Sequence, residues 1–278
     1  MKSIVDVCAP AKINLFLHIV GRRADGYHLL ESVFALIDWC DTLHFDVRSD
    51  AAISREDLTQ PLPADDLVVR AARALQQASA TTLGAHIGID KQIPSQAGLG
   101  GGSSDAASTL LALNRLWRLN FSLDQLQAIG LQLGADVPFF LGGHNAWVSG
   151  IGDHIEPLNL PAARLLVVKP SEGLVTQLIF SHPELKRDTQ PAILPRFVAD
   201  AYGYGHNDLQ PVARQLCPEV DQALNWLAGL GLDARMTGSG SAVFARVLPG
   251  CQLSNPPGSM QSRLCNTLSV HPLFGWAG

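Results

Sequence analysis

Four glycines within five positions interrupt the chain in the segment Gly98-Leu99-Gly100-Gly101-Gly102-Ser103-Ser104. Residues 86–89 before it predict a strand. The alanine- and leucine-rich residues 105–117 after it predict a helix, with Ser103 or Ser104 as its N-cap. Glycines let a backbone approach an anion closely, and the free N–H groups of a first helical turn favour negative charge. A strand, this loop and a helix in that order therefore predict a phosphate-binding site.

Two common glycine-rich motifs are excluded by the residues around this loop. A Walker A loop needs a lysine after its last glycine, and no lysine follows Gly102. The dinucleotide fingerprint Gly-x-Gly-x-x-Gly needs a glycine at position 103 or 105, where Ser103 and Asp105 stand. A flexible loop with an ordinary serine cap accounts for one or two glycines but not for four.

The composition sets limits on what the protein does and where it works. The 278 residues are 47% hydrophobic and 16% charged, which predicts a folded chain of one large or two modest domains. A net charge of −5 argues against binding nucleic acid or an acidic membrane. The five cysteines are scattered without a Cys-x-x-Cys pair, which indicates a reducing compartment. Asp6 and Lys12 interrupt the apolar N-terminus, so we expect a cytoplasmic protein with a small-molecule partner, as a monomer or a homodimer.

Strands and helices mix along the chain without regular alternation, which predicts an α+β fold. Residues 13–20 alternate like a half-buried strand, which places Lys12 and Asn14 on one face. Three turn-forming residues in 150–153 predict a boundary between domains 1–153 and 154–278. The remaining predicted elements are strands through Leu29 and 33–37, 43–47, 164–168, around Met236 and 242–247, helices 67–77, 122–133 and 219–230, and a loop over 250–258.

Three segments in a fixed order resemble the motifs of the GHMP kinase superfamily of small-molecule kinases. They are Ala9-Pro10-Ala11-Lys12-Ile13-Asn14-Leu15, the glycine-rich segment from Pro94 to Ala107, and Met236-Thr237-Gly238-Ser239-Gly240-Ser241-Ala242-Val243-Phe244. Three ordered motifs are far more specific than one. The resemblance implies a two-domain fold with an active site in the cleft between the domains, and ATP as the phosphate donor.

Three further segments narrow the resemblance to the 4-diphosphocytidyl-2-C-methyl-D-erythritol kinases. They are residues 10–17, Arg23-Ala24-Asp25-Gly26-Tyr27-His28, and Leu133-Gly134-Ala135-Asp136-Val137-Pro138-Phe139-Phe140. This family phosphorylates the 2-hydroxyl of its cytidyl substrate in the non-mevalonate isoprenoid pathway. Two alternatives stay open: another GHMP kinase of the homoserine or phosphomevalonate type, and a non-catalytic sensor with the same fold. The presence of both Lys12 and Asp136 disfavours the sensor.

Lys12 and Asp136 are the candidate catalytic residues. From spacing alone, Asp136 is equally well an N-cap, because it stands two residues before Pro138. Lys12, at the start of a strand, is from spacing alone a solvated charge. The resemblance implies instead that Asp136 accepts the substrate proton, and that Lys12 lies beside it and stabilises the charge that develops.

The resemblance also implies a pocket for the cytidyl group. Tyr27 would stack on the base and His28 would hydrogen-bond its edge, whereas from spacing alone this pair is more often on the surface. Phe180 would cover the other side of the base. The other residues implied for substrate binding are Asn14, Ile151, Thr176, Gly238, Ser239 and Gly240.

The ATP site implied by the resemblance centres on the glycine-rich loop. Lys91 would lie near the adenine, although from sequence alone it is a solvated strand-end charge. Asp66 stands where the family usually carries an asparagine, and the loss of an amide donor predicts a looser purine preference. No metal cage is visible, so Mg²⁺ would arrive with ATP and touch Ser103 or Ser104. The residues implied for ATP binding are Asp66, Lys91, Pro94, Gly98, Leu99, Gly100, Gly101, Gly102, Ser103 and Ser104.

Overall fold

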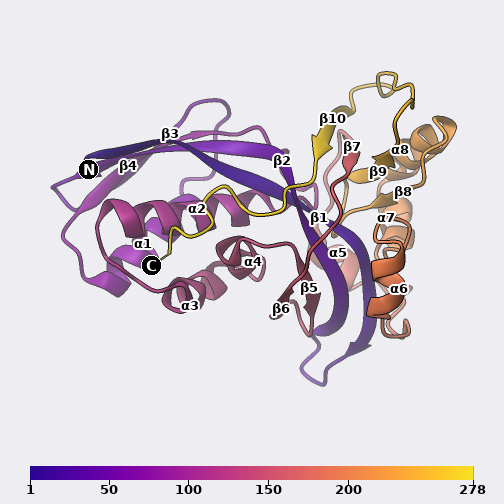
Figure 1. Ribbon diagram of the computed structural model, residues 1–278, viewed down its shortest axis with the longest axis horizontal. Helices are drawn as coiled ribbons and strands as arrows, with labels where there is room; N and C mark the ends of the chain where they lie inside the picture. The colour runs from indigo at the N-terminus through magenta and orange to yellow at the C-terminus, as the bar shows by residue number, and fades with distance from the viewer. Residues whose placement is uncertain (278) are drawn as a thin grey trace.

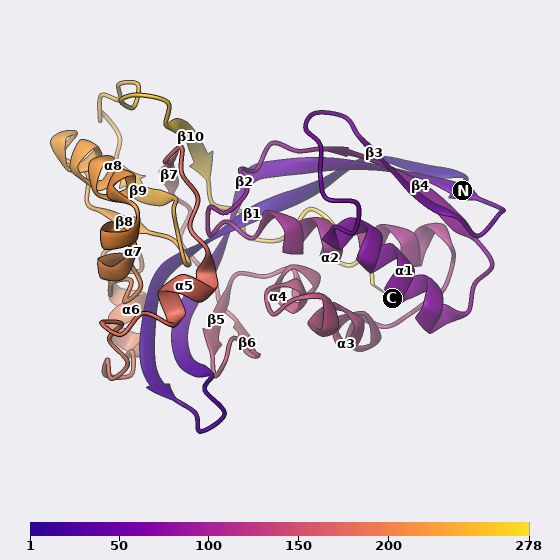
Figure 2. The same ribbon diagram turned by 180° about the vertical axis from the view of Figure 1, so that it is seen from behind.

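Two sheets with helices packed beside them form two lobes in the computed structural model, which describes residues 1–277 (Figures 1 and 2). The first sheet has the order β3-β4-β2-β5-β6, with β1 paired to β2, and the second has the order β10-β7-β9-β8. Every pair is antiparallel except β3 with β4, which fits an α+β fold. The strands are β1 Ser3–Arg22, β2 His28–Arg48, β3 Ile53–Asp57, β4 Gly84–Asp90, β5 Ala146–Ser149, β6 His154–Pro157, β7 Arg164–Lys169, β8 Ala234–Met236, β9 Val243–Val247 and β10 Gln261–Asn266.

The eight helices of residues 1–277 divide between the lobes. Helices α1 to α4 lie along one face of the first sheet, and α5 to α8 lie in the second lobe (Figures 1 and 2). Within residues 1–277, no helix has the length and apolar character needed to cross a membrane. The helices are α1 Leu67–Ser79, α2 Gly101–Leu116, α3 Leu123–Leu133, α4 Val137–Gly142, α5 Thr176–Phe180, α6 Leu194–Ala199, α7 Gln210–Leu216 and α8 Pro218–Gly229.

The long β1–β2 pair connects the two lobes (Figure 1). The two separate strands predicted over 29–37 and 43–47 are one strand, β2, which stays paired to β1 through several register shifts. The prediction that 13–20 is half-buried is also wrong. Leu15 and Phe16 point to opposite faces, yet both are buried, because they pack in one apolar cluster with second-lobe residues such as Val167.

Local capping sets the start of two helices but not of α2. Asp66 caps α1, and Ser122 forms a capping box with Gln125 at α3, as their sequences favour. Helix α2 begins at Gly101, and its N-cap is Gly100 with no side-chain cap. The predicted serine N-cap is therefore wrong, because a glycine with a φ of 72° turns the chain into the helix earlier.

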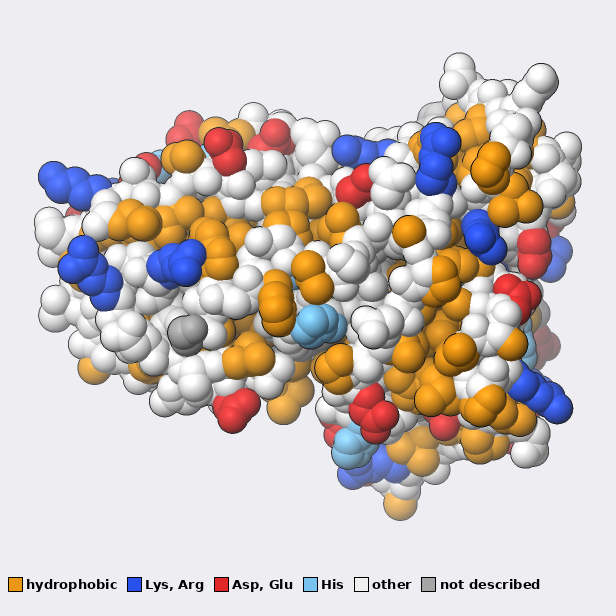
Figure 3. Space-filling view, in the orientation of Figure 1, with side chains coloured by type: hydrophobic (Ala, Val, Ile, Leu, Met, Phe, Trp, Pro, Cys, Tyr) orange, Lys and Arg blue, Asp and Glu red, His pale blue; other side chains and the backbone are white. Residues whose placement is uncertain are grey.

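Both ends of the segment after residue 153 belong structurally to the first lobe. The hairpin of β5 and β6 crosses the predicted 153/154 boundary, so the first sheet ends at Pro157. The C-terminal tail returns to the same lobe, where the Leu268 N–H donates to the Leu36 carbonyl at 2.8 Å. A space-filling view shows a notch between the two lobes (Figure 3).

Candidate active site

Three segments that are far apart in the sequence meet where the lobes join. The Lys12 N–H donates to the Leu99 carbonyl at 2.9 Å, which attaches β1 to the glycine-rich loop. The Asn14 N–H donates to Thr237 Oγ1 at 2.8 Å, and the Ala242 N–H donates to the Ala97 carbonyl at 3.2 Å. Residues of both lobes line a cavity of about 870 Å³ at this junction. This places the candidate site in the cleft that the sequence predicts.

Two glycines of the loop allow these close approaches. Gly98 has a φ of +72°, and a Cβ there would lie 2.3 Å from the Thr237 carbonyl oxygen. Gly100 has the same φ, and its Cβ would lie 3.1 Å from the Lys12 Cγ. A larger side chain at either position would push the loop away from β1 or from the segment after β8.

The N-terminus of α2 presents free donors to the cavity. Ser104 is the first residue of the helix whose N–H has a helical acceptor, the Gly100 carbonyl at 2.9 Å. Within residues 1–277, the N–H groups of Gly101, Gly102 and Ser103 donate no hydrogen bond. Three unused donors at a helix N-terminus make an anion-binding site.

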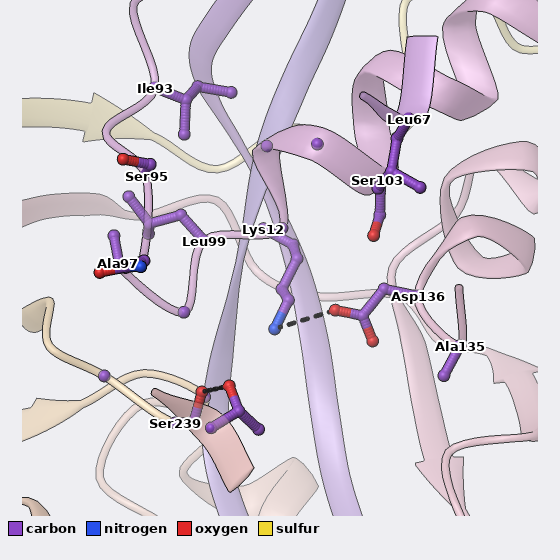
Figure 4. Close-up of a pocket in the computed structure, with 18 of the residues that line it drawn as sticks. Lys12, Leu67, Ile93, Ser95, Ala97, Leu99, Ser103, Ala135, Asp136 and Ser239 are labelled. Atoms are coloured by element: carbon purple, nitrogen blue, oxygen red, sulfur yellow. Dashed lines mark hydrogen bonds and ion pairs between the residues drawn. The ribbon is translucent and has the colours of Figure 1, made fainter. Parts of the chain in front are cut away.

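Lys12 and Asp136 face each other across the cavity, with Lys12 Nζ 3.6 Å from Asp136 Oδ2 (Figure 4). The Lys12 side chain is 5% exposed and that of Asp136 is 33% exposed. Asp136 is the N-cap residue of α4, as its position before Pro138 predicts, but its side chain makes no capping hydrogen bond and stays available to the cavity. At this separation the attraction is on the order of 4 kcal/mol before the cost of desolvation.

A chain of hydrogen bonds fixes the Lys12 ammonium. Lys12 Nζ donates to Asn14 Oδ1 at 2.7 Å, which confirms that the two side chains share a face. Asn14 Nδ2 donates to Ser32 Oγ at 2.8 Å, and that hydroxyl donates to the Phe16 carbonyl. Lys12 Nζ also lies 4.7 Å from the centroid of the Phe34 ring. Ser32 is not among the residues that the sequence predicts, because only the pairing of β1 with β2 brings it to Asn14.

The two serines of α2 point in different directions. Ser103 lines the cavity and points to the side where Asp136 lies (Figure 4). Ser104 is fully buried away from the cavity, and its hydroxyl has no partner within the described residues. The predicted contact of Ser104 with phosphate or Mg²⁺ is therefore wrong, because adjacent residues of a helix point about 100° apart.

Asp66 and Lys91 are both held by ion pairs. Asp66 accepts from the Val69 N–H at 3.1 Å and contacts Arg55 Nη1 at 2.6 Å, so its carboxylate is satisfied within the protein. Lys91 contacts the carboxylates of Asp41 and Asp105, and its side chain is 8% exposed. The alternative of a solvated strand-end charge at Lys91 is therefore wrong.

The other end of the cavity carries part of the predicted cytidyl pocket. Phe180 lines it, and the His28 ring lies 5.2 Å from the Phe180 ring. His28 Nε2 accepts from Arg187 Nε at 3.0 Å, and burial together with the Arg187 charge lowers the pKa of His28. Tyr27 is 62% exposed at the β1–β2 turn, and neither Tyr27 nor His28 lines the cavity. The structure thus brings His28 to Phe180 and leaves Tyr27 apart.

Most of the predicted site residues line this one cavity. Thr176 Oγ1 and Ser239 Oγ lie 2.7 Å apart, joining α5 to the segment after β8. Arg70 on α1 lines the cavity without having been predicted. The predicted residues that line it are Lys12, Asn14, Asp66, Lys91, Pro94, Gly98, Leu99, Gly100, Gly101, Gly102, Ser103, Asp136, Ile151, Thr176, Phe180, Gly238, Ser239 and Gly240.

The oxygen donors at the cavity fit a Mg²⁺ ion that arrives with phosphate. Within residues 1–277, no group of three His, Cys, Asp or Glu side chains is arranged to hold a metal. Ser103 and Asp136 line the same side of the cavity, and only one Asp136 oxygen contacts Lys12. Hydroxyl and carboxylate oxygens are ligands that Mg²⁺ accepts alongside substrate phosphates and water.

Comparisons with known proteins agree with this geometry. The GHMP kinases N terminal domain model matches residues 66–144, and the GHMP kinases C terminal model matches residues 193–256. The chain is 70% identical to the 4-diphosphocytidyl-2-C-methyl-D-erythritol kinase of Albidiferax ferrireducens, over 100% of this chain and 96% of that one. It is 60% identical to the kinase of that name from Variovorax paradoxus, over the full length of both.

Solved structures show the same relationship. A crystal structure of 4-(cytidine 5'-diphospho)-2C-methyl-D-erythritol kinase matches with a TM-score of 0.75 and 32% identity, covering 95% of this chain and 98% of that one. A mevalonate kinase matches with a TM-score of 0.69 at 13% identity, covering 96% and 99%, which shows a shared fold. The chain therefore belongs to the GHMP kinases and, among them, to the 4-diphosphocytidyl-2-C-methyl-D-erythritol kinase family.

Proposed function

We propose that the protein transfers the γ-phosphoryl group of Mg²⁺-bound ATP to the 2-hydroxyl of 4-diphosphocytidyl-2-C-methyl-D-erythritol. The reaction would belong to cytoplasmic isoprenoid synthesis by the non-mevalonate pathway. Family membership supports the substrate. The observation that carries the chemistry is the Lys12–Asp136 pair, which lines the same cavity as the free N–H groups of α2. An acid–base pair beside an anion cradle suits phosphoryl transfer to an alcohol.

Each group in the cavity has a separate task in this reaction. The N–H groups of Gly101, Gly102 and Ser103 hold phosphate oxygens at the positive end of α2. Asp136 accepts the proton of the substrate hydroxyl, and Lys12 stabilises the negative charge on the transferred group. Ser103 and Asp136 would hold a Mg²⁺ ion that arrives with ATP, and that ion would supply positive charge to the phosphates.

The cytidyl end of the substrate would lie against Phe180 and His28. The lowered pKa keeps the His28 ring neutral near pH 7. Because Nε2 accepts from Arg187, the neutral ring carries its proton on Nδ1. That N–H can donate to an acceptor on the cytosine edge while Phe180 covers the base face. Tyr27 would reach the base only by moving from its exposed position.

A substrate panel tests this function. We expect ATP consumption with the diphosphocytidyl alcohol and none above background with homoserine or mevalonate phosphates, measured by a coupled ADP assay. Phosphorus NMR of the product should show a new phosphomonoester on the 2-hydroxyl. Consumption with homoserine or a mevalonate phosphate alone would move the chain to another GHMP activity. Binding of the cytidyl alcohol without ATP consumption would favour the sensor.

A further inference from the structure

A buried group of three charged side chains lies at the base of the glycine-rich loop, and two of them, Lys91 and Asp105, also line the cavity. Lys91, just after β4, contacts Asp41 on β2 and Asp105 on α2. Lys91 Nζ lies 2.6 Å from Asp105 Oδ2. The three side chains are 8%, 0% and 3% exposed, respectively, and two of them, Asp41 and Asp105, have no place in the reaction described above. We call these residues the Asp41–Lys91–Asp105 triad.

The triad fixes both ends of the loop. Lys91 precedes the glycines and Asp105 follows them, so their contact closes the loop at its base. Asp41 Oδ1 accepts from the Ile93 N–H at 2.8 Å and from the Gln92 N–H, which anchors the segment entering the loop. Fixing both ends of a loop removes conformations that would otherwise compete with the binding geometry.

The triad also lies directly behind the first residue of α2. A Cβ on Gly101 would lie 3.5 Å from Asp41 Oδ2 and 3.0 Å from Ile93 Cγ2. Gly101 and Gly102, whose N–H groups donate no hydrogen bond within residues 1–277, line the cavity from the same turn. A shift of the Asp41 carboxylate would therefore move the donors that bind phosphate.

The charge balance of the triad depends on Lys91. Burial opposes the charged form of Lys91, but the two aspartates outweigh it and raise the pKa of the ammonium. Burial raises the pKa of Asp105 well above its usual value, and Lys91 offsets only part of that rise. Without Lys91, two buried carboxylates would remain behind a site for a triphosphate, where they would repel the ligand.

We propose that the Asp41–Lys91–Asp105 triad positions the glycine-rich loop, so that Lys91 acts on ATP binding through the two aspartates rather than by touching the nucleotide. Both named acceptors of its ammonium are within the triad. Lys91 is thus a positioning residue, in contrast to the adenine contact implied by the family resemblance. The proposal rests on the ATP-binding role of the loop given under Proposed function.

Nucleotide binding to the full-length protein separates the two roles. ADP affinity would be measured by calorimetry, without turnover, for the wild type, Lys91→Met, Asp41→Asn and Asp105→Asn. We expect Lys91→Met and Asp41→Asn each to weaken ADP binding by about tenfold, because each leaves buried charge without its partner. Asp105→Asn should also weaken ADP binding, because it removes one of the two carboxylates that hold the Lys91 ammonium. If Lys91 contacts the nucleotide directly, Lys91→Met should lose ADP affinity while Asp41→Asn keeps the wild-type affinity. That result would overturn the proposal.

A change in the length of the Asp41 side chain tests the positioning role while the negative charge of the carboxylate is kept. Asp41→Glu retains the carboxylate but displaces it by one methylene, so the positioning role predicts an increase in KM for ATP with an unchanged KM for the cytidyl alcohol. Unchanged KM values for both substrates would contradict positioning. This variant also serves if Lys91→Met fails to fold, as judged by urea unfolding. Lys2→Met, at an exposed lysine, is the matched control and should bind ADP like the wild type.

The ADP-binding measurements distinguish a failure of this proposal from a failure of the proposed function. If the wild type does not bind ADP, the proposed function fails. If the wild type binds ADP and Asp41→Asn binds it equally well, only the positioning proposal fails. The double variant Lys91→Met/Asp41→Asn should be less impaired than the sum of the single changes, because residues acting as one unit are not additive. Additive losses would contradict the triad.

Discussion

The carboxylate of Asp136 could either cap the helix that follows it or stay available to a substrate. It makes no capping bond and lies 3.6 Å from Lys12 Nζ, so it is available. We expect Asp136→Asn to lower kcat by about 10²–10⁴-fold, because the amide cannot accept the hydroxyl proton. KM for ATP should change by less than about twofold, since the loop donors are untouched. Steady-state kinetics with both substrates varied measures this split.

The same chemical change on a nearby helix provides the control. Asp124→Asn alters an exposed aspartate in the first turn of α3 and should leave kcat unchanged. A loss of kcat below about tenfold for Asp136→Asn would remove the base assignment, given the usual size of such effects. A parallel rise in KM for ATP would instead make Asp136 a nucleotide-binding residue.

At the scale of the elements, the glycine-rich loop works only if its backbone can touch β1 and the segment after β8. We expect Gly98→Ala to raise KM for ATP by more than about tenfold, because the new methyl would collide with the Thr237 carbonyl at a positive φ. The matched control is Gly229→Ala at the end of α8, where a Cβ meets nothing within 4 Å. It should leave KM for ATP unchanged. Wild-type ATP kinetics in Gly98→Ala would show that the loop tolerates a side chain.

Elements whose boundaries depend on local chemistry could be predicted from the sequence. Ser122 and Gln125 form the cap that their spacing favours, and α3 begins where expected. The start of α2 was predicted too late, because the left-handed conformation of Gly100 replaces a serine cap. The sequence predicts two strands where β2 is continuous. Asp38 and Asp41 lie inside β2, and both carboxylates accept backbone N–H groups from other segments.

At the scale of the whole molecule, the sequence motifs identify many site residues but not the residues that hydrogen-bond to them and hold them in place. Asp136 and Lys12 could be identified because each lies in a recognisable segment. Ser32, Asp41 and Arg187 could not, because their roles depend on strand register and on packing between distant segments. Local spacing also misplaced Ser104, since its direction follows from where α2 begins.

The C-terminal tail packs on the first lobe through His271, which is 1% exposed. Its N–H donates to the Gly143 carbonyl at 2.8 Å, and its Nδ1 accepts from the Leu273 N–H at 3.0 Å. Burial lowers the pKa of His271 from 6.5 to about 4. Between these values the unfolded chain binds a proton that the folded chain does not, so acid favours unfolding.

The free energy of unfolding should therefore depend on pH in a defined window. The contribution of His271 is constant above about pH 6.5, falls by about 1.4 kcal/mol per unit between pH 6.5 and 4, and totals about 3 kcal/mol. Burial also lowers the pKa of His18 to about 4, so one variant removes only part of the pH dependence of the unfolding free energy.

Urea unfolding at pH 7.5, 5.5 and 4.5 should show a shallower pH dependence for His271→Gln than for the wild type. Because His154 is exposed, His154→Gln is the control and should follow the wild-type profile. Parallel profiles for His271→Gln and the wild type would mean that the buried ring does not resist protonation, and that the tail opens before the lobes unfold.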